Sequence, residues 1–298
     1  MDKRRIFILG VVLCLFLSAF GLIGGGVHSD APQSVLFLDV GQGDAALLSD
    51  GNGFDVLIDG GKKSATGAIL EVLRQQGISE LDVVVATYPD ADHVGGLIGV
   101  FQARDLSILR AISNGCENDT QTWSELKAAA AERGLTFEEI RFPAVLQWGL
   151  MTVYVLHPAA GSACSQTDTN RDSLFLRVDF GRMRYLFTGD VNATVEATIV
   201  ARQTPLAAQV LKVSHHGSAG ATSDGFLAAA SPMEGVISVG PNSYGHPAPA
   251  VLDRLRQAGV TIWRTDCHGT VRVESDGVGY QVLPQTFCQT VFLPLVMR

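Results

Sequence analysis

Three polar clusters of the sequence carry residue types that could do chemistry, and each of them follows an apolar stretch. The first cluster contains Asp90, Asp92 and His93, the second contains Asp190, and the third contains His215 and His216. Carboxylates and imidazoles are the ligands that a divalent metal needs in a protein. One such cluster alone is more often a solvated turn. Three of them, each after an expected strand, predict a metal site.

The elements that must position these clusters are three short strands, expected over residues 81–86, 184–188 and 210–214. Mixed α/β sheets tend to place function at the carboxyl ends of their strands, which is where all three clusters begin. The first cluster is expected to be a loop that Pro89 opens and that Gly95 and Gly96 close. Such a loop can turn several ligand atoms toward one point.

Hydrophobic periodicity and turn residues predict the remaining elements. Further strands are expected over residues 34–38, 45–48, 54–58, 106–112, 151–156, 174–180, 235–239, 261–264, 270–274 and 280–283. Helices are expected over residues 67–76, 122–133, 193–201, 226–230 and 249–258. This order fits mixed sheets that are covered by helices. No Pro- or Ser-rich linker interrupts it, so we expect one catalytic domain over residues 30–283.

The composition narrows the class of protein. The chain has 298 residues, 47% of them apolar and 17% charged, which excludes global disorder. It has 22 basic and 30 acidic residues, which gives a formal net charge of −8. This balance argues against a surface that binds nucleic acid mainly by cationic attraction. It does not exclude an enzyme that neutralises a phosphate with a metal.

Both ends of the sequence differ from the part between them. Lys3, Arg4 and Arg5 precede an uncharged run over residues 6–26. A basic start before an apolar run is typical of a secretory signal or a membrane anchor, and about 20 residues can cross a bilayer. We expect residues 1–29 to direct export, so that the chain is secreted or anchored on the outer face of the cytoplasmic membrane. Residues 284–298 are an apolar tail, either an extra edge strand or an exposed segment.

Export makes the cysteines candidates for disulfides. Apart from Cys14, four cysteines remain, and the last two flank an expected strand. This spacing favours the pair Cys267–Cys288 and leaves the pair Cys116–Cys164. Four unpaired cysteines that pack as small apolar residues are the alternative.

The first cluster, residues 88–96, resembles the HxHxDH-GG loop of the metallo-β-lactamase fold. The match is closest to the variant HxDxDHxGG of the hydrolase domain of ComEC-type competence proteins. Other stretches of the chain also resemble that domain, in the same order along the sequence. They lie at residues 37–44, 57–61, 170–174, 186–190, 211–218, 242–247 and 264–266. The resemblance covers about residues 34–275. Channel segments of that family are absent from this sequence, so we expect a free-standing relative.

The resemblance implies an α/β fold, a four-layer αββα sandwich with its metal site at the edge of both sheets. It implies Asp92 and His93 as ligands of one ion, with His216 or His215 as the third. It implies Asp190 as a carboxylate that can bridge two ions. We expect His216 to be the ligand and His215 to contact a substrate phosphate, with the reverse assignment left open. Asp59 is expected to orient a metal-ligating histidine.

Tyr88 departs from the family pattern, which usually has a histidine there. The first metal position would keep Asp90, Asp190 and either a phenolate or nothing from Tyr88. A phenol with a pKa near 10 is a poor ligand unless a metal ionises it. We therefore expect one well-held ion and one weak or substrate-assisted ion. The oxygen-rich ligand set leaves both Zn²⁺ and Mn²⁺ open.

The resemblance implies an exported, metal-dependent phosphodiesterase or nuclease with a role in DNA uptake. Hydroxide formed from metal-bound water would attack phosphorus, and Asp90 or Asp92 would accept the proton of that water. Residues expected to hold the substrate or to protonate the leaving oxygen are Tyr88, Lys212, His215, Ser218, Asn170 and His246.

Two alternatives to a nuclease stay open. The acidic balance and the lack of a basic, aromatic groove favour a small phosphodiester as substrate. Tyr88 favours a degenerate, non-catalytic member that binds phosphate esters or an envelope partner. In each case we expect a monomer, with membrane association through the N-terminal segment as a further possibility.

Overall fold

The computed structural model describes residues 32–165 and 167–288. The expected signal or anchor at residues 1–29 and the last ten residues of the tail lie outside the described residues. Within the described ranges, no helix has both the length and the apolar character that crossing a membrane requires.

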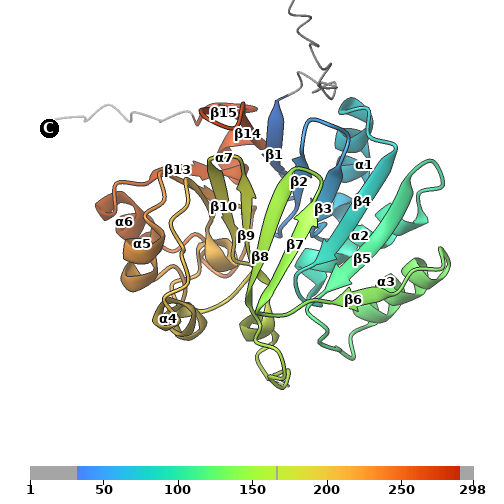
Figure 1. Cartoon of the computed structure of the whole chain (residues 1–298), viewed down its shortest axis with the longest axis horizontal. Coiled ribbons are helices and arrows are strands. Elements are labelled where there is room, and N and C mark those ends of the chain that lie inside the picture. The colour runs from blue at the N-terminus through green and yellow to red at the C-terminus, as the bar shows by residue number, and fades with distance from the viewer. Residues whose placement is uncertain (1–31, 166, 289–298) are drawn as a thin grey trace, which may run out of the picture.

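The chain folds into two mixed sheets that lie face to face (Figure 1). The first sheet has the strand order β15 (Tyr280–Pro284), β14 (Val271–Ser275), β1 (Gln33–Phe37), β2 (Ala46–Ser49), β3 (Asp55–Ile58), β4 (Glu80–Ala86), β5 (Ser107–Ser113) and β6 (Phe137–Glu139). The second has the order β13 (Thr261–Arg264), β12 (Glu234–Ile237), β11 (Val210–Lys212), β10 (Met183–Phe187), β9 (Phe175–Phe180), β8 (Met151–His157) and β7 (Ala144–Trp148).

Each sheet combines an antiparallel part with a parallel part. Strands β3 to β6 are parallel in the first sheet, and strands β10 to β13 are parallel in the second. A parallel connection needs a crossover, and helices form most of these crossovers. The carboxyl ends of parallel neighbours lie at one edge of their sheet, so the loops after β4, β10 and β11 are brought to the rim of the sandwich.

Helices cover the outer face of each sheet. The first sheet carries α1 (Thr66–Gln75), α2 (Ala91–Gln102) and α3 (Gln121–Ala131), and the second carries α4 (Ala193–Ala201), α5 (Asp224–Ala230) and α6 (Pro249–Gln257). Short helical turns complete the set at η1 (Lys63–Ala65), η2 (Thr169–Asp172), η3 (Ser214–Gly217) and α7 (Thr265–His268). Figure 1 shows the two helical groups on opposite sides of the strands. The expected αββα sandwich is confirmed.

The alternation of side chains along the strands explains the three layers of core. In β4, Val83 and Val85 point into the core between the sheets, whereas Val84 and Ala86 face the helices. Successive side chains of a strand point to opposite faces, and here both faces are buried. Such strands read as nearly continuous apolar runs, which is why the sequence signals them clearly.

The structure differs from the sequence expectation most at the first polar cluster. Residues 91–102 form helix α2 rather than a loop, so Asp92 and His93 lie in its first turn. Glycine disfavours a helix interior, but a Cβ on Gly95 would lie only 2.6 Å from the backbone nitrogen of Lys63. A Cβ on Gly96 would collide with the carbonyl oxygen of Gly60. Tertiary packing against the loop after β3 therefore overrides local propensity. The short strands β6 and β7 were also not expected.

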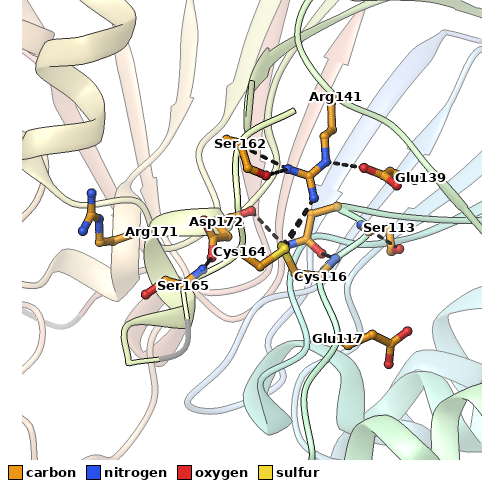
Figure 2. Close-up of a disulfide and its surroundings, with 12 residues drawn as sticks. Ser113, Cys116, Glu117, Glu139, Arg141, Ser162, Cys164, Ser165, Arg171 and Asp172 are labelled. Carbon is orange, nitrogen blue, oxygen red and sulfur yellow. Dashed lines mark hydrogen bonds and ion pairs between the residues drawn. A yellow bond between two sulfur atoms is a disulfide. The ribbon is translucent and has the colours of Figure 1, made fainter. Parts of the chain in front are cut away.

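Both expected disulfides are present. Cys116–Cys164 joins the loop after β5 to the loop after β8, with Cα atoms 5.7 Å apart. Cys267–Cys288 joins α7 to the residues after β15. Figure 2 shows the first disulfide beside Arg141, whose guanidinium donates to both sulfur atoms and to Ser162, and pairs with Glu139.

Candidate metal centre

The loops after β4, β10 and β11 bring together His93, Asp190 and His216. One ligand atom from each of the three lies within 4.8 Å of the other two. The Nε2 atoms of His93 and His216 each lie 3.4 Å from an oxygen of Asp190. All three side chains are buried, with at most 2% of their surface exposed. Residues more than a hundred positions apart in the sequence thus form one compact cluster.

The polar atoms of this cluster that face one another lack hydrogen-bond partners. Nε2 of His93, Nε2 of His216 and Oδ1 of Asp190 are all buried and have no hydrogen-bond partner among the described residues. Buried polar atoms are normally hydrogen-bonded, so three that converge point to a missing common partner. Two imidazole nitrogens and a carboxylate are a suitable donor set for a divalent cation. The residues present therefore fit the metal that the sequence predicts.

Asp92 lies at the open side of the cluster. Its Oδ2 is 3.7 Å from Nε2 of His216, and 26% of its side chain is exposed. Its place in the first turn of α2, next to His93, lets one helical turn supply two ligand candidates. Asp92 can therefore add a second carboxylate to the donor set while keeping contact with solvent.

A carboxylate fixes the orientation of His93. Nδ1 of His93 lies 2.8 Å from Oδ2 of Asp59. Asp59 also accepts hydrogen bonds from the backbone N–H and the hydroxyl of Thr87, at 2.8 and 2.7 Å. A histidine that donates its Nδ1 proton to a carboxylate presents the lone pair of Nε2 to a metal. The structure gives Asp59 the contact that the sequence predicts.

The tandem histidines take different positions because of an unusual backbone turn. His215 and His216 have φ values of 50° and 51°, a region that non-glycine residues seldom adopt. His216 turns inward, and its Nδ1 donates to the carbonyl oxygen of Ser238 at 2.8 Å. His215 remains at the rim with 28% of its side chain exposed, and its Nε2 is 3.8 Å from Asp190. The turn thus separates a buried imidazole from an accessible one.

The charges around the cluster shift the pKa of its histidines. Burial by itself would lower the pKa of His216, but Asp190 and Asp44 outweigh it and raise that pKa to about 9. For His93, burial is outweighed in the same way by Asp190, Asp59 and Asp44, and its pKa is raised well above the usual value. Burial favours the neutral form of Asp190, but the two histidines hold its pKa well below the usual range. The cluster therefore has a strong preference for positive charge at its centre.

Lys212 lies beneath the cluster rather than in the open site. Its ammonium pairs with Asp44, donates to the carbonyl oxygen of Gly189 at 3.2 Å, and lies 3.8 Å from Asp190. Burial would lower its pKa, but Asp44 and Asp190 outweigh burial and raise it. Only 5% of the Lys212 side chain is exposed. The structure thus differs from the expectation that Lys212 holds a substrate, because its ammonium is enclosed by the carboxylates that it neutralises.

Tyr88 is also buried, and its hydroxyl donates to Oδ2 of Asp190 at 2.7 Å. Burial and the nearby carboxylates of Asp190, Asp92 and Asp90 raise the pKa of Tyr88 well above 10. The phenol is therefore neutral at physiological pH and acts as a donor to Asp190. In the metal-free chain, Tyr88 is thus a hydrogen-bond donor to Asp190.

Asp90 lies at the N-cap of α2, on the outer wall of the site. It accepts a hydrogen bond from the Thr169 hydroxyl at 3.0 Å. Burial, opposed by that hydrogen bond, raises the pKa of Asp90. The carboxylate of Asp90, which the sequence analysis expects to accept a proton from water, thus already has a protein partner in Thr169.

The remaining predicted substrate contacts lie at the rim. The imidazole of His246 packs against that of His215, with ring centroids 5.5 Å apart. Ser218 follows η3 and is partly exposed, with its backbone N–H bonded to the carbonyl of His215 at 2.8 Å. Asn170 lies in η2, where its carbonyl oxygen accepts from Ser173. Among the described residues, no hydrogen bond joins the Asn170 side chain to the cluster.

Comparisons with known proteins agree with this architecture. The family model of the metallo-beta-lactamase superfamily matches residues 38–162. The chain is similar to ComE operon protein 3 of Bacillus subtilis, 31% identical over 79% of this chain and 32% of that protein. It is similar to competence protein ComA of Neisseria gonorrhoeae, 31% identical over 80% of this chain and 32% of that protein. Among solved structures it is similar to Tm1679, described as a metal-dependent hydrolase of the beta-lactamase superfamily, with a TM-score of 0.52 and 14% identity over 82% of this chain and all of that one.

The fold is that of the metallo-β-lactamase superfamily. The resemblance to ComEC-type proteins that the sequence predicts is confirmed as well. The chain spans about a third of the length of the curated relatives it matches. Superfamily members of this kind are generally metal-dependent hydrolases, and the donor set of His93, Asp190 and His216 is consistent with that chemistry.

The wall beside Asp90 is tied to the first disulfide, which Figure 2 shows. Cys164 is followed by Ser165, whose backbone N–H donates to Asp172 in η2. Asp172 also accepts, through its carbonyl oxygen, the side-chain amide of Asn114 at 2.8 Å. The same short turn η2 holds Thr169, the partner of Asp90. The disulfide thus supports one wall of the candidate metal site.

Several residues around this candidate metal site were not singled out as functional from the sequence. They are Asp44, Thr169, Ser173 and Ser238. Asp44 belongs to a stretch that the resemblance already covers, which is a usable signal. Thr169, Ser173 and Ser238 act through single hydrogen bonds to residues far away in the sequence. No local pattern marks such contacts.

Proposed function

We propose that the chain is a metal-dependent phosphodiesterase that acts outside the cytoplasmic membrane. The observation that carries this proposal is the convergence of three buried, unpartnered atoms from His93, Asp190 and His216 beside the accessible side chains of Asp92 and His215. Such a site can hold a cation on its inner side and receive a charged substrate on its outer side.

We assign the ligands of the ion to Asp92, His93, Asp190 and His216. When bound, a divalent ion there supplies a Lewis acid for a phosphoryl oxygen and lowers the pKa of a coordinated water. Asp59 and the Ser238 carbonyl hold the two imidazoles in the tautomer that a ligand needs. The choice of His216 over His215, which the sequence analysis expects from the resemblance, is supported by the burial of His216 and by its hydrogen bond to Ser238.

The rim residues supply proton transfer and orientation. Burial, only partly offset by Asp190, lowers the pKa of His215, so its imidazole is neutral at physiological pH. A neutral imidazole at the rim can accept a proton from the attacking water, a role that it shares with Asp90 and Asp92 as candidates. Ser218 and His246 lie on the same side and are the candidates to contact the phosphate.

Two further points favour a phosphodiester over other substrates. The site is rich in carboxylates, which suits oxygen-preferring ions such as Mn²⁺ as well as Zn²⁺. One relative is named competence protein ComA, and the resemblance to ComEC-type proteins implies a role in DNA uptake, so DNA is the first substrate class to test. A small diester is the second, because the chain has a formal charge of −8 and gains little from cationic attraction to DNA.

Export rests on the basic and apolar start of the chain and on the two disulfides. Disulfides persist in oxidising compartments and are rare in the cytosol. Fractionation of cells that express the chain tests this part of the proposal. In each fraction, thiol labelling measures whether Cys116 and Cys164 are oxidised. Free thiols in a cytosolic fraction would contradict it.

The test of the activity combines elemental analysis of the purified chain with turnover of bis-p-nitrophenyl phosphate. We expect about one equivalent of Mn or Zn, and turnover that a chelator removes and the ion restores. Asp190→Ala should lose both the ion and the turnover. Asp253→Ala, in an exposed ion pair of α6, is the matched control and should change neither. Turnover that survives both the chelator and Asp190→Ala would rule the proposal out.

The non-catalytic alternative has one specific observation in its favour, the hydrogen bond from Tyr88 to Asp190. A binding protein would retain its ion but show no turnover with any diester. The same experiment separates the two functions, because occupancy and turnover are measured on one sample.

A further inference from the structure

We propose that Tyr244 is a stacking platform for a nucleobase of the substrate, beside the phosphate that the metal centre receives. This inference rests on the proposed phosphodiesterase function and names a contact outside the metal centre. It adds a specificity-determining residue that neither the sequence motifs nor the relatives assign.

Three rings lead from the metal centre to the surface. His215 lies against Asp190, its ring centroid is 5.5 Å from that of His246, and the ring of His246 is 5.7 Å from that of Tyr244. The rings of His246 and Tyr244 are inclined by only 31°. Tyr244 is 71% exposed at the end of this row. An aromatic side chain is thus presented to solvent two rings away from the expected ligands.

The loop that carries Tyr244 is held firmly from within. The amide nitrogen of Asn242 donates to the carbonyl oxygens of Gly240 and His246, at 2.8 Å each. Its amide oxygen accepts from the backbone N–H groups of Tyr244 and His246, at 3.0 and 3.1 Å. One side chain therefore makes four hydrogen bonds that shape the loop.

The same loop is also attached to the turn that positions His216. The backbone N–H of Ala248 donates to the carbonyl oxygen of Gly217 at 2.8 Å. Pro247 packs so closely on Gly217 that a Cβ there would lie 2.6 Å from the proline Cβ. A ligand held by Tyr244 is therefore held in a fixed position relative to His216. Such pre-organisation reduces the entropy lost on binding.

Stacking is the form of recognition that this chain can use. Base–aromatic stacking contributes about 1–3 kcal/mol per base and needs no positive charge on the protein. The chain is acidic, so affinity from phosphate neutralisation away from the metal is small. Of the two aromatic side chains described as exposed, Tyr244 and Phe287, only Tyr244 has a ring contact that leads to the site.

The experiment compares thymidylyl-thymidine with analogues in which one or both bases are replaced by hydrogen. Tyr244→Ala should lower kcat/KM for the dinucleotide by about 5- to 150-fold, which corresponds to the stacking energy. For the analogue that lacks the stacked base, Tyr244→Ala and the unsubstituted chain should have equal kcat/KM. Tyr244→Phe and Tyr244→Trp should retain activity, and Phe287→Ala serves as the matched control.

A binding measurement separates this inference from the proposed activity. The fluorescence of Trp in the Tyr244→Trp variant, relative to the unsubstituted chain, should be quenched by thymidylyl-thymidine and not by the base-free analogue. Quenching without turnover would support the base subsite and overturn the phosphodiesterase. An equal loss of kcat/KM with all analogues, or no quenching by the dinucleotide, would overturn the subsite.

Discussion

The two halves of the metal centre use their polar atoms differently. In the half formed by His93, Asp190 and His216, three buried atoms converge that have no hydrogen-bond partner within residues 32–165 and 167–288. In the half formed by Tyr88 and Asp90, the phenol donates to Asp190 and the carboxylate accepts from Thr169. The first half presents free electron pairs to a cation, whereas the second half satisfies its own polar groups within the protein.

This difference shows what the exchange of histidine for Tyr88 does. The replacement of the usual histidine by Tyr88 removes a ligand and also adds a hydrogen bond from the phenol to Asp190. Asp190 is the carboxylate that is expected to bridge two ions. A neutral phenol with a raised pKa occupies an oxygen of Asp190 that a second ion would need. We therefore expect one tightly held ion, and a second ion that depends on the substrate.

The largest expected effect tests the assignment of the tandem histidines. His216→Ala should lose the ion and all turnover, because it removes a buried ligand from the first half. His215→Ala should keep one equivalent of the ion and lose turnover by on the order of 10²-fold, the range of a general base. Metal analysis and kcat on the same samples distinguish the two. The reverse pattern would assign the ligand to His215.

The next effect tests whether the second half can be converted. Tyr88→His restores the usual histidine and removes the phenol from Asp190, so we expect metal occupancy to rise from about one to two equivalents. Tyr88→Phe is the matched control, since it removes only the hydroxyl and adds no ligand, and occupancy should stay near one. Elemental analysis measures both. Two equivalents in the unsubstituted chain would show that the phenol does not block the second position.

The strands could be predicted because they depend on local patterns, whereas the four-layer sandwich was implied by the resemblance to the metallo-β-lactamase fold. Strand β4 is apolar on both faces, and the clusters after β4, β10 and β11 stand out in the sequence. Helix α2 could not be predicted, because Gly95 and Gly96 disfavour a helix locally and are required by the close approach of Gly60 and Lys63. Local propensity and tertiary packing disagree at that point, and packing prevails.

The ligand candidates could be predicted, but not their division into two halves. Whether His215 or His216 turns inward depends on the positive φ values of both residues. These φ values cannot be predicted from the residue types. The ion pair of Lys212 with Asp44 joins positions 168 residues apart, and only the fold brings them together. From the sequence, Tyr88 indicates only the loss of a histidine ligand. In the structure, its phenol is a hydrogen-bond donor to Asp190.

A smaller effect concerns the dependence of the first half on pH. The pKa of His216 in the folded, metal-free chain is about 9, above its ordinary value of 6.5. The stability that this shift contributes is fully present below pH 6.5 and is lost as the pH rises through 9. A bound ion requires neutral imidazole, so its affinity should increase over the same range, by about 1.4 kcal/mol per pH unit for each proton displaced.

The thermal unfolding of metal-saturated and chelator-treated chains measures this linkage. We expect the difference in Tm between the two to widen from pH 6.5 to 9 and to level off above it. The His215→Ala variant should show the same widening, because His215 is not the ligand. A difference that narrows with rising pH would mean that no histidine proton is displaced by the ion.

The smallest expected effect on the ion comes from the first disulfide. Cys116→Ser with Cys164→Ser should lower the free energy of unfolding by about 2–4 kcal/mol, yet leave metal occupancy unchanged. The reason is that the disulfide supports η2 and through it Asp90, which belongs to the second half. KM should change with this pair and not with the matched pair Cys267→Ser and Cys288→Ser. Urea unfolding measures the free energy of unfolding, elemental analysis measures the metal occupancy, and kinetics measure KM. A loss of the ion would show that the two halves are coupled through η2.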